Sequence, residues 1–187
     1  MTLESSAAQL EAFAALSVAA QALEEAGITY FLSNGTLLGC IREGTFVPHD
    51  SDIDIGVLST DGLLEKFIAR GFELRREWGS AGKPAHEYTF IAPGFLNIKL
   101  DVFCYTLESD HSWMGLWTEK CPCKACANLP PYKKMIFPKF EGVVQKDFYG
   151  MRFPVPSNYE KFLTAQYGDW WIVDKDYHWF NSPKNLQ

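Results

Sequence analysis

Hydrophobic residues near the N-terminus recur at helical spacing, and short apolar runs replace this pattern further along the chain. Within residues 3–26, the spacing of the apolar side chains predicts one helix that stops at Gly27. The residues on its apolar face are Leu10, Phe13, Leu16, Ala20 and Leu23. The chain is therefore expected to open with a helix that packs through one side.

The apolar runs that follow predict strands with further helices between them. Strands are expected at residues 28–32, 52–58, 72–78, 88–91 and 97–105, and helices at residues 35–43 and 61–70. A hairpin over residues 143–155 should turn at Tyr149-Gly150, and a capping box at Ser157–Glu160 should open a helix that ends before Gly168. Residues 106–140, rich in Cys, Pro and Trp, are expected to be irregular. The pattern is typical of an α+β or α/β domain.

Composition narrows the classes of protein that this pattern allows. The 187 residues fit one domain, residues 1–187, and 47% hydrophobic with 21% charged residues excludes a largely disordered chain. A net charge of −6 without a block of Lys or Arg disfavours a nucleic-acid partner. No apolar run reaches the roughly 20 residues of a membrane span, and the acidic N-terminus is not that of a signal peptide. We therefore expect a cytoplasmic protein.

An Asp-Ile-Asp sequence inside an apolar run marks the candidate chemistry. Alternate side chains of a strand share a face, so Asp52 and Asp54 project together while Ile53 and Ile55 turn to the core. Two adjacent carboxylates repel each other unless a cation lies between them, and oxygen ligands suit Mg²⁺ or Mn²⁺. The segment predicts a phosphate-handling metal site. Asp50, one further step back, is a third ligand, a supporting group or a loop cap.

A third carboxylate interrupts a later apolar strand. Asp101 lies between Leu100 and Val102, and we expect it on a strand beside that of Asp52 and Asp54. It would bind a metal ion or accept the proton of an attacking hydroxyl. Lys99, two residues earlier, faces the same side and is a candidate to neutralise a substrate phosphate.

A Gly-Thr turn opens the short helix that precedes the Asp-Ile-Asp strand. Gly35 and Thr36 would let a phosphate approach the free N–H groups at that helix N-terminus. Arg42, near the end of the same helix, has a planar fork suited to phosphate, with a salt bridge to Glu43 or Asp50 as the alternative.

Three of the five cysteines cluster as Cys121, Cys123 and Cys126. In a reducing compartment such spacing indicates metal binding before disulfides. Zinc takes four ligands, and Cys104 or His111 would complete the set. Free thiols that pack a loop are the alternative to this structural zinc site.

Several motifs in order resemble one family. Gly35–Gly39 with Arg42, followed by Pro48–Asp54, is similar to the LicD and fukutin family, which has the nucleotidyltransferase fold. The C-terminal half agrees through Tyr149-Gly150 with Phe153–Pro156, Tyr167–Trp170 and His178–Pro183. The resemblance implies an α+β fold, with a nucleotidyltransferase-like mixed sheet flanked by helices and a Cys-rich insertion.

The resemblance also implies a reaction. Family members move a phospho-alcohol (phosphocholine, ribitol phosphate or glycerol phosphate) from a CDP-linked donor to a glycan hydroxyl and release CMP. Asp52, Asp54 and Asp101 would then be the catalytic carboxylates. A nucleotidylyltransferase acting on a small molecule, which releases pyrophosphate, is one alternative. An inactive nucleotide- or glycan-binding domain is another.

Overall fold

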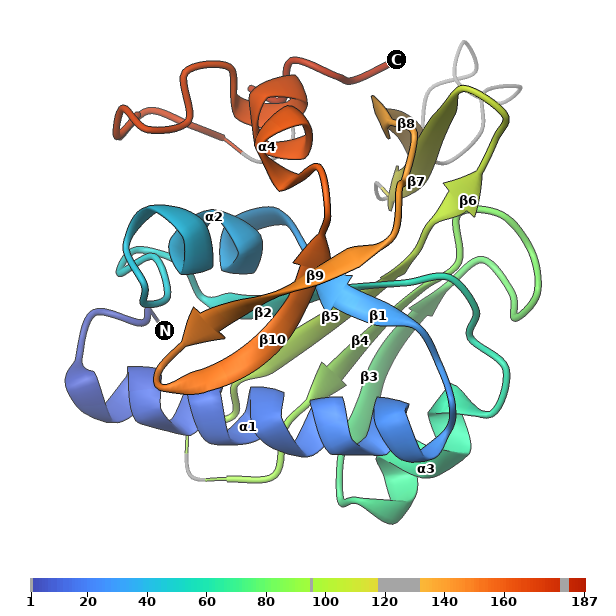
Figure 1. The fold of residues 1–187 in the computed structure, drawn as a ribbon. Helices are drawn as coiled ribbons and strands as arrows, with labels where there is room; N and C mark the ends of the chain where they lie inside the picture. Colours follow the sequence, from blue (N-terminus) through green and yellow to red (C-terminus); the bar gives the residue numbers. More distant parts are fainter. Residues whose placement is uncertain (1, 95, 118–131, 179–181) are drawn as a thin grey trace, which may run out of the picture.

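The computed structural model describes residues 2–94, 96–117, 132–178 and 182–187 (Figure 1). Its helices are α1 Ser6–Glu25, α2 Asn34–Arg42, α3 Leu63–Ala69 and α4 Tyr159–Tyr167. Its strands are β1 Tyr30–Leu32, β2 Asp52–Val57, β3 Glu73–Trp78, β4 Glu87–Ile91, β5 Lys99–Cys104, β6 Thr106–Leu107, β7 His111–Trp117, β8 Tyr132–Pro138, β9 Val143–Phe148 and β10 Met151–Pro156.

A five-stranded sheet in the order β1-β2-β5-β4-β3 forms the centre of the fold. β2 and β5 pair in parallel, and the other neighbouring strands of this sheet pair antiparallel. In Figure 1, α1 and α3 lie below this sheet and α2 and α4 lie above it. The expected mixed sheet flanked by helices is therefore confirmed.

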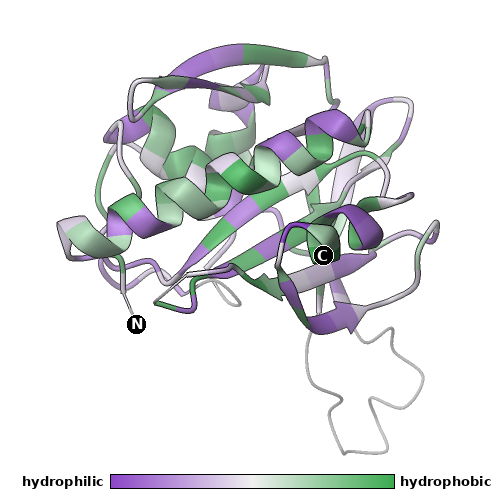
Figure 2. Cartoon of the chain, turned by 90° about the horizontal axis from the view of Figure 1, so that it is seen from below, coloured by the Kyte–Doolittle hydropathy of each residue, from purple (hydrophilic) through white to green (hydrophobic). Residues whose placement is uncertain are grey.

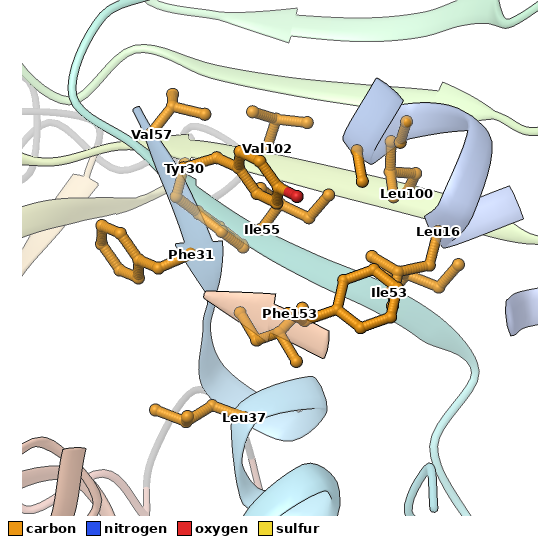
Figure 3. Close-up of a cluster of buried hydrophobic side chains, with 14 of the residues drawn as sticks. Leu16, Tyr30, Phe31, Leu37, Ile53, Ile55, Val57, Leu100, Val102 and Phe153 are labelled. Carbon is orange, nitrogen blue, oxygen red and sulfur yellow. The ribbon is translucent and has the colours of Figure 1, made fainter. Parts of the chain in front are cut away.

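Alternation along the two central strands sends apolar side chains to one face. Ile53 and Ile55 of β2 are buried, as are Leu100 and Val102 of β5. Figure 3 shows these side chains in one cluster, together with Leu16 of α1. The acidic residues between them in sequence must therefore point to the opposite face.

The first helix packs mainly through small residues. Ala8, Ala12 and Ala19 are buried, whereas Leu10 is 62% exposed, so the expectation that Leu10 belongs to the packed face is wrong. Figure 2 shows α1 crossing the lower face with hydrophilic and apolar residues mixed along it. Ser5 caps its N-terminus by accepting a hydrogen bond from the Ala8 N–H at 3.1 Å. The helix therefore begins at Ser6, later than expected.

Residues 106–140 contradict the prediction of an irregular segment. In the described part of this range β6, β7 and β8 form an antiparallel sheet. The middle of β7 is buried on both faces, so its sequence carries no polar alternation to mark it as a strand. Cys121, Cys123 and Cys126 lie outside the described residues.

The C-terminal elements agree with the sequence except at one helix start. β9 and β10 form the expected hairpin, with Tyr149 and Gly150 at φ of 52° and 78° in its turn. The helix cap is Asn158, whose side chain makes no capping hydrogen bond, so the capping box predicted from Ser157 is wrong. Among the described residues, no helix combines the length and the apolar character needed to cross a bilayer.

Candidate active site

The open face of the five-stranded sheet is the floor of a cavity of about 1070 Å³. The strand register arranges its floor in cross-strand rows. The row nearest one end is Asp52, Lys99, Ile91 and Glu73; the next is Asp54, Asp101, Thr89 and Arg76; the third is Gly56, Phe103, Glu87 and Trp78. The walls come from the start of α2, the end of α4, and Met114, Leu116 and Met135 of β7 and β8.

Carboxylates converge at the β2 end of this floor. Asp50, Asp52 and Asp54 each offer an oxygen, and these oxygens lie within 4.8 Å of one another. Asp54 stands opposite Asp101 across the parallel pair, and Asp52 stands opposite Lys99. The expected adjacency of the two strands is confirmed. Three roles were left open for Asp50. The structure places its carboxylate beside the carboxylates of Asp52 and Asp54.

The Gly-Thr turn holds one of these carboxylates in place. The Gly35 N–H donates to Asp54 Oδ2 at 3.0 Å, and the Asp54 N–H donates to Thr36 Oγ1 at 2.8 Å. The Thr36 side chain is buried. The turn therefore orients Asp54. The phosphate contact expected for Gly35 and Thr36 is a different role, and it stays a prediction.

The absence of a side chain at Gly35 leaves room for two carboxylates that pack against it. A Cβ at this position would clash with Asp50 Oδ2 and crowd Asp54 Oδ2. We expect Gly35→Ala to displace Asp50, to lower the free energy of unfolding by about 1–3 kcal/mol and to weaken Mn²⁺ binding. Thermal melts and Mn²⁺ titration measure both effects.

Gly35→Ala/Asp50→Ala is the control, because it should recover stability but not Mn²⁺ affinity. Wild-type Mn²⁺ binding in the single variant would contradict this reading.

The carboxyl groups of the cavity titrate abnormally because they are buried together. Burial, with the charge of Asp52 and a hydrogen bond to it, raises the pKa of Asp50 to about 8. Burial and the neighbouring carboxylates hold the pKa of Asp54 well above its usual range. Burial raises the pKa of Asp101 to about 6, although a hydrogen bond from Thr89 acts in the opposite direction. The site thus holds more carboxyl groups than can all be ionised together without a cation.

A divalent cation fits the residues present. Asp101 Oδ1 and Asn34 Oδ1 are buried acceptors that lack a hydrogen-bond partner among the described residues. Both line the cavity that holds the cluster of Asp50, Asp52 and Asp54, and all of these residues offer oxygen, the donor that hard cations prefer. The Asp cluster could therefore hold a divalent metal ion.

The same pKa shifts predict how stability depends on pH. The folded state of the metal-free protein holds more protons than the unfolded chain from about pH 4 to about pH 8, because the pKa values of Asp50 and Asp101 are raised. Its free energy of unfolding should therefore fall as pH rises through this window. Thermal melts in EDTA from about pH 5 to about pH 9 measure the fall. Mg²⁺ should make it shallower, because a ligand of the folded state stabilises that state. Stability that rises with pH in EDTA would contradict this assignment.

Arg42 lies apart from the carboxylate cluster. Its Nη2 and Nε contact Glu43 Oε1 at 2.6 and 3.1 Å, and its Nη1 donates to the Trp170 carbonyl at 3.1 Å. It is absent from the described residues that line the cavity. The structure therefore shows the salt bridge to Glu43, and the phosphate contact of Arg42 stays a prediction.

The sequence reasoning missed charged residues on the cavity floor, among them Glu87 and Arg76. Glu87 is 8% exposed, and burial with the charge of Asp101 raises its pKa to about 8. Arg76 occupies the same row as Asp101 but two strands away. The available signal was the alternation along residues 73–78 and 87–91, which is clear only once the strand register is known.

The candidate zinc site cannot be placed. Cys121, Cys123 and Cys126 lie outside the described residues, so structural zinc stays a prediction. Of the two candidates for a fourth ligand, Cys104 is a half-buried free thiol at the end of β5. His111 begins β7, and its Nδ1 donates to Asp110 Oδ1 at 2.7 Å.

The fold and the site together define a class of protein. The lincomycin-bound lincosamide antibiotic adenylyltransferase LnuA matches with a TM-score of 0.51 at 16% sequence identity, over 80% of this chain and 83% of that chain. The fold is that of the nucleotidyltransferases. The sequence model of the LicD/FKTN/FKRP nucleotidyltransferase domain matches residues 27–158. The chain belongs to this family, as its motifs indicated.

Two curated relatives carry names that describe an activity. Human ribitol-5-phosphate transferase FKTN is 31% identical over 190 residues, which cover 100% of this chain and 39% of the relative. Human ribitol 5-phosphate transferase FKRP is 29% identical over 161 residues, covering 83% of this chain and 30% of the relative. The chain spans less than half the length of these two relatives.

Proposed function

We propose that residues 1–187 form a metal-dependent phosphotransferase domain that moves ribitol 5-phosphate from CDP-ribitol to a glycan hydroxyl and releases CMP. The observation that carries this proposal is the parallel register that sets Asp54 opposite Asp101 and Asp52 opposite Lys99. The names of the FKTN and FKRP relatives favour ribitol phosphate over phosphocholine or glycerol phosphate.

The residues of the site suit phosphoryl transfer. The reaction forms a bond from the acceptor oxygen to phosphorus, breaks the bond from phosphorus to the CMP oxygen, and moves the hydroxyl proton to a base. Such transfer depends on positioning and charge neutralisation more than on a protein nucleophile. Bound Mg²⁺ or Mn²⁺ would neutralise phosphate charge at Asp52, Asp54 and Asp101. Lys99 adds a positive charge beside Asp52, and Gly35 keeps the Asp54 carboxylate oriented.

Product analysis with candidate donors tests the proposal. The protein, in Mg²⁺, is incubated with CDP-ribitol, CDP-choline, CDP-glycerol and nucleoside triphosphates in the presence of a glycan acceptor. We expect CMP from CDP-ribitol, and EDTA should stop its release. Pyrophosphate from a triphosphate would identify a nucleotidylyltransferase instead. Binding of CDP-ribitol without any product would identify a nucleotide-binding domain.

Thermal shift gives an independent readout of the donor. A ligand that binds only the folded state raises the melting temperature, by an amount that grows with ligand concentration relative to Kd. CDP-ribitol with Mg²⁺ should raise it more than CDP-choline or CDP-glycerol does. Equal shifts for the three donors would leave the cytidine diphosphate as the recognised part and contradict selection of ribitol.

A further inference from the structure

Lys99 is the cation at the carboxylate end of the cavity, opposite Asp52. Phosphorylated substrates are anionic, yet the cavity is lined by more acidic residues than cations, namely Asp50, Asp52, Asp54, Glu73, Glu87 and Asp101 against Arg75, Arg76 and Lys99. A metal ion at the Asp cluster would neutralise the group bound there, at one end of the floor. A second anionic group further along the floor would need a cation of its own.

Arg76 is the cation that the fold positions at the other end of the floor. It lies on β3, in the same row as Asp101 and separated from it by Thr89 of β4. Two strand spacings amount to about 10 Å, which places it beyond the carboxylate cluster. Arg76 lines the cavity, and its positive charge acts to lower the pKa of both Asp101 and Glu87.

The Arg76 side chain is exposed and lies against an aromatic stack. Its Cζ lies 5.3 Å from the centroid of the Trp78 ring, within the range of a cation–π interaction. Trp117 of β7 stacks on Trp78, with the ring centroids 5.5 Å apart and the ring planes 7° from parallel. Trp117 is itself fixed, because its Nε1 donates to the Ala85 carbonyl at 2.6 Å. The stack therefore ties the guanidinium to two sheets.

The guanidinium held in this way makes no ion pair with any described residue. Arg42, by comparison, is paired with Glu43 outside the cavity. A cation–π contact with a ring uses none of the N–H donors of a guanidinium, so they stay available for an anion. A planar edge of N–H donors matches phosphate oxygens in bidentate geometry.

We propose that Arg76, supported by Trp78, is the residue that binds a substrate phosphate away from the carboxylate cluster. That phosphate belongs either to the CDP-linked donor or to a phosphorylated sugar acceptor. The identity of the two sources rests on the proposed function, but the anion site itself does not.

Calorimetric titration of Arg76→Gln in Mg²⁺ tests this inference. The probes are CDP-ribitol, a hexose 6-phosphate and the same hexose without phosphate. Affinity for at least one phosphorylated probe should fall about 10- to 100-fold, the range expected for losing a hydrogen bond to a charged group. Trp78→Leu should cause part of this loss of affinity, because it frees the guanidinium. Arg76→Lys should keep only part of the wild-type affinity. Arg152→Gln, at an exposed position of β10, is the matched control and should bind like wild type.

The outcomes answer two questions: whether Arg76 binds a phosphate, and whether that phosphate belongs to the donor or to the acceptor. Loss confined to CDP-ribitol assigns the donor phosphate, and loss confined to the hexose 6-phosphate assigns an acceptor phosphate. If wild type ignores CDP-ribitol but binds the hexose 6-phosphate through Arg76, the proposed donor is wrong and the Arg76 site stands.

Two results would overturn the inference. One is unchanged affinity of Arg76→Gln for both phosphorylated probes, including the case in which wild type binds neither. If the melting temperature then falls, Arg76 is only a counter-ion for Asp101 and Glu87. The other is an equal or larger loss in Arg75→Gln, whose side chain also lines the cavity but has no ring partner among the described residues. That result would move the phosphate contact to Arg75.

Discussion

Asp52→Asn is expected to abolish the release of CMP, a loss on the order of 10³-fold or more. The substitution keeps the shape of the side chain and removes the charge that faces Asp50 and Asp54. Removing one of several crowded carboxylates relieves repulsion, so the metal-free protein should melt at the same or a higher temperature than wild type. Loss of activity without loss of stability is therefore the expected combination.

Rate of CMP release, Mn²⁺ affinity and melting temperature are measured on the same preparations. Asp147→Asn is the matched control, because Asp147 is an exposed carboxylate on β9 and its loss should change none of the three. Full CMP release by Asp52→Asn would remove Asp52 from the site. A variant that is inactive because it no longer folds would be recognised by its melting curve, and Asp52→Glu would then replace it.

Asp101→Asn is expected to cut kcat by about 10²- to 10⁴-fold. Asp101 is either a metal ligand or the base that accepts the acceptor proton, and the two roles predict different failures. A lost ligand raises the metal requirement, so extra Mn²⁺ should restore part of the rate. A lost base leaves donor binding near wild type, and no metal concentration restores the rate.

We expect the ligand behaviour for Asp101, because its Oδ1 is a buried acceptor that lacks a hydrogen-bond partner in the described ranges. A carboxylate beside a metal ion also has a lowered pKa and is a weaker base. The measurement is kcat as a function of Mn²⁺ concentration for wild type and variant. A variant with wild-type kcat would exclude both roles.

The parts of the site that sequence could predict are those set by alternation along one strand. Asp52 and Asp54 share a face because Ile53 and Ile55 must be buried, and the structure agrees. Asp101 obeyed the same rule on β5. The pairing of β2 with β5 was expected because Asp101 was interpreted as the third carboxylate of the same site, and the register confirms it.

The parts that sequence could not predict depend on which way a long side chain turns and on pairing between distant strands. Arg42 stood in a family motif, but Glu43 beside it in the chain offers its guanidinium a closer partner. Arg76 stood in no motif, and its place follows from Trp78 two residues later and from the register of β3 with β4. Glu87 lies just before the expected strand at 88–91, so no signal in the sequence indicated that it belongs to β4 and is buried.

The parallel pairing of β2 with β5 also decides when the carboxylates meet as the chain folds. These strands are joined through α3, β3 and β4, so their contact closes a long loop and belongs to the slow, non-local part of folding. The repulsion between Asp54 and Asp101 arises only when that contact forms. A cation that takes Asp101 as a ligand binds only after that contact, so Mg²⁺ held in this way should slow unfolding and leave the refolding rate nearly unchanged. The bound metal would thus lengthen the lifetime of the folded domain.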